Sequence, residues 1–125
     1  MVGIGGTASP ASPQRGDIHW VAFRDDAGHV IAGWHPAVVV QTPAMARSST
    51  IMVVPMTSKA RSGQLRPPYL VAVSARESGL SKDGWVKADQ IVTIDVAELG
   101  DRAGRLSAPK IVELDAALRF VLALS

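Results

Sequence analysis

The sequence predicts a small α+β domain that is mainly β, in which five or six short strands form a strongly bent antiparallel barrel and a C-terminal helix follows them. Three observations support this fold class. Residues 18–24 alternate with the period of two that is typical of a strand. Residues 37–40 are all apolar and three are β-branched, as in a strand buried on both faces. Residues 111–124 repeat apolar side chains at helical spacing.

Composition favours one globular domain. The chain has 125 residues, of which 47% are apolar and 19% charged, so it can bury a core without disulfides or a structural metal. We expect residues 1–14, rich in glycine, alanine, serine and proline, to be a disordered tail and residues 15–125 to be the domain. The tail lacks the pattern of a signal peptide or membrane anchor. Cysteine is absent, which excludes thiolate metal sites and favours the cytoplasm.

Turn signals divide the chain into strands. The expected strands are, in order, residues 18–24, 36–40, 51–55, 69–73, 85–94 and 102–106. We expect residues 36–40 to be the central strand. Residues 25–33 read as a hairpin loop, residues 44–50 as a connection or single helical turn, and residues 77–84 as a polar turn. Residues 59–68 hold three basic residues, a glycine and two prolines, which favours an exposed mobile loop.

Caps mark the helical parts of the last third of the chain. Asp95 can cap a short turn that runs to Leu99, and Ser107 can cap a helix with Pro109 in its first turn. This helix extends to about Leu124, and its apolar side chains surround it almost completely. It therefore needs cover on two sides, which we expect from its own sheet and from a second subunit.

Charge is distributed unevenly. Residues 27–76 contain no acidic residue, and their five cations outweigh the net charge of +2 for the whole chain. These cations are Arg47, Lys59, Arg61, Arg66 and Arg76. An acid-free half of a small domain favours contact with a polyanion such as RNA, and a merely solvated basic surface is the alternative.

Five motifs occur along the chain in one order. They are Arg15-Gly16-Asp17-Ile18-x-Trp20-Val21; Gly28-His29 with Gly33-x-x-Pro36-Ala37-Val38-Val39-Val40; Val53-Val54-Pro55-x-Thr57-Ser58; Asp89-Gln90-Ile91-x-Thr93-Ile94-Asp95; and Gly104-Arg105-Leu106-Ser107 before the helix. Together they resemble the MazF/PemK toxins of bacterial toxin–antitoxin pairs. The resemblance implies an SH3-like barrel, a homodimer, cleavage of single-stranded RNA without metal or cofactor, and inhibition by a cognate antitoxin peptide.

The resemblance also implies two catalytic sets, and this chain departs from both. In the MazF-like set an arginine before the proline works with a threonine; here Thr57 is present but His35 replaces the arginine. In the PemK-like set an aspartate works with an arginine and a loop histidine; here Asp89 and His29 match but Lys87 replaces the arginine. Lysine keeps the charge without the bidentate fork, and histidine is charged only part of the time near neutral pH.

We therefore assign candidate roles by chemistry. The 2′-hydroxyl of RNA is a built-in nucleophile, so a base, an acid, a cation and hydroxyl ligands would suffice. Asp89 is the expected base, His29 or His35 the acid, Lys87 the cation, and Thr57 with Ser58 the phosphate ligands. The remaining candidate RNA contacts are Lys59, Arg61, Arg66, Trp34 and Gln90.

Each assignment has a structural alternative. Asp89 interrupts an otherwise good strand, so it is exposed, partnered or functional, since a buried unpaired carboxylate is costly. Thr57 and Ser58 also suit a turn or cap, and His29 a solvated loop. Trp34 can stack on a base or pack at a subunit interface. Three histidines with Asp89 could bind a metal, but no spacing is diagnostic and no metal site is assigned.

Three functions from different classes follow. The leading one is a sequence-selective endoribonuclease toxin. The second is a barrel weakened by the loss of both arginines that binds RNA or an antitoxin. The third is a toxin of the same fold that poisons a protein target such as a topoisomerase. Discrete RNA cuts in EDTA are expected of the first alone.

Overall fold

The computed structural model describes residues 12–24, 31–58 and 66–125. The first eleven residues of the expected tail, the histidine His29, and the cations Lys59 and Arg61 lie outside the described residues. Within the described part of the chain, no helix is long and apolar enough to cross a membrane.

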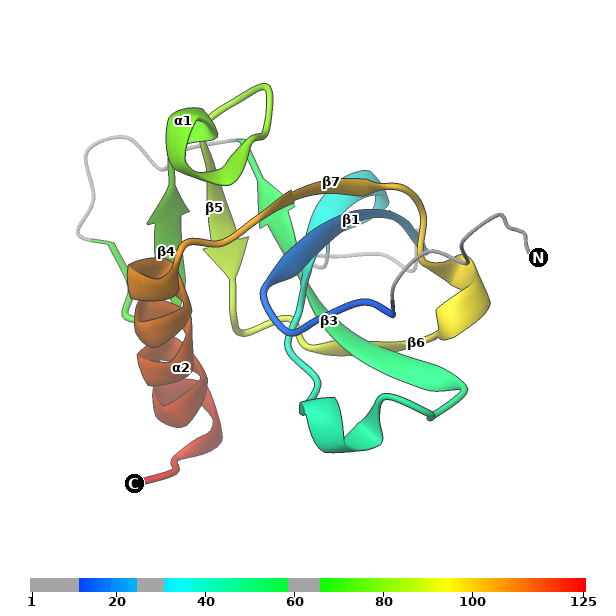
Figure 1. Ribbon diagram of the computed structural model, residues 1–125. Helices are drawn as coiled ribbons and strands as arrows, with labels where there is room; N and C mark the ends of the chain where they lie inside the picture. Colours follow the sequence, from blue (N-terminus) through cyan, green and yellow to red (C-terminus); the bar gives the residue numbers. More distant parts are fainter. Residues whose placement is uncertain (1–11, 25–30, 59–65) are drawn as a thin grey trace.

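In the described ranges the chain forms seven strands and two α-helices. Figure 1 shows their arrangement. The strands are β1 Asp17–Phe23, β2 Gly33–Val39, β3 Thr50–Thr57, β4 Leu70–Val73, β5 Gly84–Lys87, β6 Val92–Asp95 and β7 Arg102–Arg105. The helices are α1 Ala75–Ser78 and α2 Ala108–Leu122, with 3-10 turns at Pro43–Met45 and Val96–Glu98. The mainly β fold with a C-terminal helix is thus confirmed.

The predicted caps form as expected. The hydroxyl of Ser107 accepts a hydrogen bond from the main-chain N–H of Lys110 and begins α2, and Asp95 begins the short turn Val96–Glu98. The prediction of a polar turn over residues 77–84 was wrong at its start, because residues 75–78 form one turn of α-helix. Ser74 and Glu77 close a capping box there, which satisfies the first N–H groups of α1.

The strand order is β4-β5-β3-β2-β1-β7, and all pairs are antiparallel. β6 also pairs with β3, alongside residues 50–53, whereas β5 pairs with residues 56–57 of the same strand. The expected strand 85–94 is therefore divided into β5 and β6 by residues 88–91. β2 lies between β1 and β3 as a central strand, but β3 is the strand that pairs with three others.

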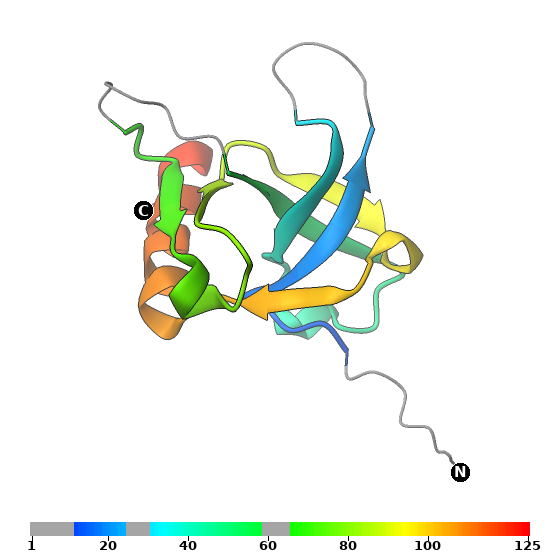
Figure 2. The same ribbon diagram turned by 90° about the horizontal axis from the view of Figure 1, so that it is seen from above.

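Two apolar clusters lie on the two faces of the curled sheet. Successive residues of β2 point into different clusters. Val38 belongs to the cluster that also holds Leu114 of α2, whereas Val39 belongs to the other cluster. α2 packs against β4, at the opposite side of the molecule from β6 (Figures 1 and 2). Burial of residues 37–40 confirms that this strand is covered on both faces.

Gly104 allows β7 to close over α1. A Cβ atom at this position would collide with the main-chain oxygen of Ser78. Only glycine permits this approach, which brings α1 and the segment that follows it against β7. The close contact sets one wall of the groove described below.

Candidate active site

The register of β2, β3 and β5 places two predicted site residues, His35 and Thr57, near a tryptophan that was not predicted, Trp85. Thr57 of β3 lies opposite Trp85 of β5. On the other side of β3, the ladder with β2 ends where Ala37 lies opposite Pro55; continued by two residues, this register would place His35 opposite Thr57. Directly opposed residues of antiparallel strands project to the same face. His35, Thr57 and Trp85 therefore form a row, with Lys87 two residues along β5 on that face; we call this surface the Thr57 face.

His35 is held at both ring nitrogens. Nδ1 lies 3.1 Å from the main-chain oxygen of Met56, and Nε2 lies 3.0 Å from that of Ala32. The ring also contacts Phe23, with centroids 6.4 Å apart. Carbonyl oxygens only accept, so both hydrogen bonds form together only when both nitrogens carry a proton. In this conformation the imidazole joins the start of β2 to the end of β3.

The turn between β5 and β6 brings the second predicted set to the same region. Asp89 is exposed in this turn. The side-chain oxygen of Gln90 accepts from the main-chain N–H of Ile31 at 2.9 Å, next to Ala32, whose oxygen contacts His35. Gln90 thus connects the turn that contains Asp89 to the same segment as His35. His29 precedes Ile31 by two positions but lies outside the described residues.

An arginine also reaches this face. The guanidinium carbon of Arg66 lies over the ring of Trp85, 5.4 Å from its centroid. Arg66 was predicted as an RNA contact, whereas sequence reasoning assigned no role to Trp85. Only the pairing of Trp85 with Thr57 reveals its position, and no local pattern in the sequence indicates it.

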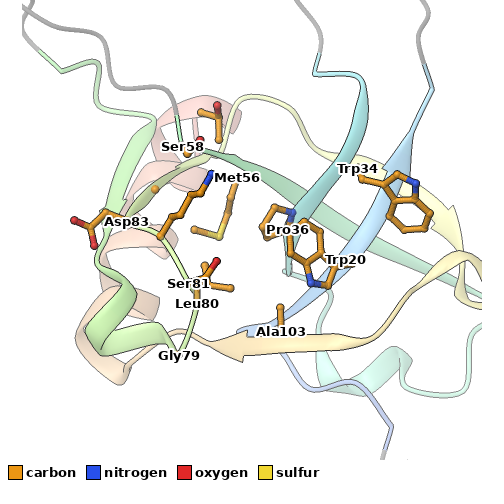
Figure 3. Close-up of a pocket in the computed structure, with 13 residues that line it drawn as sticks. Trp20, Trp34, Pro36, Met56, Ser58, Gly79, Leu80, Ser81, Asp83 and Ala103 are labelled. Carbon is orange, nitrogen blue, oxygen red and sulfur yellow. The ribbon is translucent and has the colours of Figure 1, made fainter.

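Trp34 projects to the other face of β2. It lines a groove of about 550 Å³ that Trp20, Pro36 and Met56 also line (Figure 3). The opposite wall comes from residues 79–84, between α1 and β5. Trp34 is 66% exposed, and Ser58 lies at the groove next to Thr57. We call this hollow the tryptophan groove. Thr57 also lines it, so the groove and the Thr57 face meet at the end of β3.

A charged cluster lies at the other end of β1. Burial alone would raise the pKa of Asp17, but the main-chain N–H of Gln14, the hydrogen bond from Arg105 and the charge of Arg102 together lower it. Asp17 thus ties β1 to β7, away from the Thr57 face. Among the described residues, no group of three or more His, Cys, Asp or Glu side chains could hold a metal ion.

The chain is similar in sequence to known proteins over most of its length. The model of the PemK-like, MazF-like toxins of type II toxin–antitoxin systems matches residues 14–122. The endoribonuclease EndoA of Bacillus subtilis is 30% identical over 112 residues, covering 89% of this chain and 95% of that protein.

Two solved structures have the same fold. A MazF crystal structure from Deinococcus radiodurans matches with a TM-score of 0.75 and 25% identity, covering 90% of this chain and 98% of that one. A mycobacterial endoribonuclease in complex with its cognate antitoxin matches with a TM-score of 0.70 and 27% identity, covering 90% and 97%.

The curled sheet, the closing helix and these relatives define the class of protein, an endoribonuclease of the MazF type. The chain belongs to the family of PemK-like, MazF-like toxins of type II toxin–antitoxin systems. The family and the barrel fold predicted from the five motifs are thereby confirmed.

Proposed function

We propose that this toxin cleaves single-stranded RNA at selected sequences without a metal ion, in the cytoplasm. The observation that supports this best is the proximity of the described candidates: His35 contacts the end of β3 next to Thr57, Lys87 ends the neighbouring β5, and Asp89 lies in the turn that follows. Such a surface can hold one phosphate between hydroxyl, cation and carboxylate. The relatives that carry the name endoribonuclease support the same reaction.

The reaction requires one proton removed and one supplied. Asp89 takes the proton of the 2′-hydroxyl, whose oxygen then bonds to the adjacent phosphorus. The bond from phosphorus to the 5′-oxygen breaks, and His29 or His35 protonates that oxygen, leaving a 2′,3′-cyclic phosphate. Lys87 offsets the charge on the pentavalent phosphorus, and Thr57 with Ser58 bind its oxygens. The two hydrogen bonds already made by His35 favour His29 as the acid.

The RNA strand extends from this face over basic and aromatic residues. Arg66 lies on it and Gln90 beside it, and Lys59 and Arg61 occur in the same acid-free part of the sequence. The tryptophan groove takes an unstacked base on Trp34, since an exposed indole stacks any base. A cognate antitoxin peptide with acidic residues competes with RNA for this surface, as one relative is known in complex with its cognate antitoxin.

The test is incubation of the purified chain with a long RNA in EDTA. Discrete cuts whose 5′-fragments end in a 2′,3′-cyclic phosphate are expected, and 2′-deoxy substitution at the cut nucleotide should abolish them. The Asp89→Asn protein, purified identically, controls for contaminating nucleases. RNA retention without cleavage would instead support the binding-module alternative, and inhibition of a topoisomerase without cleavage would support the protein-poison alternative.

A further inference from the structure

Arg66 is placed differently from the other cations of the acid-free stretch. Its guanidinium carbon lies over the ring of Trp85, and the arginine side chain itself is exposed. Among the described residues it forms no ion pair with a carboxylate. Its charge is therefore available to a ligand, whereas Arg15, Arg102 and Arg105 are paired with aspartates.

The position over Trp85 is close to the proposed phosphate. Thr57 and Trp85 are directly opposed, and such neighbours have Cβ atoms about 4.5–5.5 Å apart. A phosphate bound to the Thr57 hydroxyl thus lies within reach of a guanidinium held over the indole. The ring attracts the face of a guanidinium, which leaves its N–H groups directed outward to donate to phosphate oxygens.

Neither other candidate on this face supplies the same group. Both ring nitrogens of His35 already face main-chain carbonyl oxygens, and Lys87 offers a compact ammonium without a planar fork. A guanidinium donates to two oxygens of one phosphate and stays charged at every accessible pH.

We propose that Arg66 is a catalytic residue that binds the non-bridging oxygens of the scissile phosphate, and that Trp85 is its positioning residue. The inference rests on the proposed function and adds a group to its site. When the 2′-oxygen bonds to phosphorus and the 5′-oxygen leaves, negative charge grows on those oxygens. Arg66 offsets this charge and transfers no proton, so its effect is greatest in the transition state.

The first test separates rate from binding. We would measure single-turnover cleavage at saturating protein, and Kd on the same RNA made uncleavable by one 2′-deoxy substitution. Arg66→Lys keeps the charge and should bind RNA with nearly unchanged Kd while cleaving about tenfold or more slowly, and Arg66→Ala should lose about a hundredfold or more in rate. The control Arg47→Ala removes an exposed cation outside this face and should change only Kd.

Chemical rescue gives a second readout. Added guanidinium or ethylguanidinium ion should restore part of the rate of Arg66→Ala but none of that of Asp89→Asn. Trp85→Phe keeps an aromatic face and should retain most of the rate, whereas Trp85→Leu should resemble Arg66→Lys. Melting temperatures of these variants identify any that are unfolded.

The outcomes are distinguishable. Arg66→Lys cleaving as fast as wild type, or Arg66→Ala altering Kd alone, would overturn the catalytic role of Arg66 while leaving the proposed function intact. A rate for Trp85→Leu equal to wild type would overturn the positioning role. Absence of cleavage by the wild-type chain itself would overturn the proposed function and this inference together.

Discussion

At the scale of single residues, the site combines groups held by main-chain contacts with groups left open to solvent. His35 is fixed between Ala32 and Met56, whereas Asp89 is exposed in its turn. A fixed group can orient the surrounding chain, and an exposed group can approach a substrate. The structural alternative for Asp89 predicts a loss of stability on substitution, and the catalytic one predicts a loss of rate.

Asp89→Asn should lower the cleavage rate by about a hundredfold or more, because an amide cannot accept the 2′-hydroxyl proton. The melting temperature and Kd for uncleavable RNA should stay nearly unchanged, because the side chain is exposed. Single-turnover kinetics and thermal unfolding provide the measurements. A large drop in melting temperature with an unaltered rate would assign Asp89 a structural role.

His35→Arg should raise cleavage at pH 8. A guanidinium can donate to both carbonyl oxygens that His35 contacts and retain donors for phosphate. His35→Ala should lower both rate and melting temperature, because it leaves two half-buried acceptors unpaired. Initial rates from pH 5.5 to 8.5 for the three proteins test this. Parallel profiles for wild type and His35→Ala, with no gain from arginine, would remove His35 from the site.

At the scale of elements, the division of one expected strand into β5 and β6 shapes the candidate site. Both pair with β3, and the turn between them exposes Asp89 near the start of β2. At the other end of β1, the buried carboxylate of Asp17 joins β1 to β7. The two ends of β1 thus differ: the end at Phe23 lies beside the candidate site, and the end at Asp17 is tied to β7.

Asp17 should make the free energy of unfolding depend on pH in the acidic range. Its pKa is lowered in the folded state, so its stabilising effect is complete above the ordinary aspartate pKa of about 4 and is lost as pH falls through the lower folded value. Asp17→Asn should reduce the free energy of unfolding at pH 7 by about 1–3 kcal/mol and weaken the decline below pH 4. Urea unfolding across pH 3–7 measures both. The exposed Asp101→Asn is the matched control, and identical behaviour of the two variants would contradict the prediction.

At the scale of the whole molecule, α2 presents an apolar stripe that its own sheet does not cover. Leu114 and Ala117 face the core, whereas Val112, Phe120 and Leu124 are exposed. Val112 and Phe120, eight residues apart, lie toward one side of α2, and Leu124 follows the end of the helix at Leu122. The homodimer expected from the sequence would cover this stripe.

Wild-type protein should therefore sediment as a dimer at micromolar concentration. Phe120→Glu should shift it toward monomer without disrupting the subunit fold, because Phe120 is already 59% exposed. Phe120→Leu keeps an apolar side chain and should remain dimeric. Sedimentation velocity distinguishes the species, and a wild-type monomer would exclude this stripe as the subunit interface.

Local sequence patterns alone predicted much of the fold. Alternation over residues 18–24, the apolar run at 37–40, and the caps Asp95 and Ser107 each correspond to an observed element, because backbone preference and capping act over a few neighbouring residues. The order of five motifs was enough to predict the family. The interruption at 88–90 correctly marked a break, and of the alternatives left open for Asp89 the structure shows an exposed side chain.

Only the tertiary structure decided which distant residues meet. The row of His35, Thr57 and Trp85 depends on the register of three strands, and a slip of one residue would move each side chain to the other face. Register is selected by long-range packing on both faces of β3, which local periodicity does not encode. For the same reason, adjacent residues Trp34 and His35 serve separate surfaces, and Arg66 lies over Trp85 nineteen positions further along the chain.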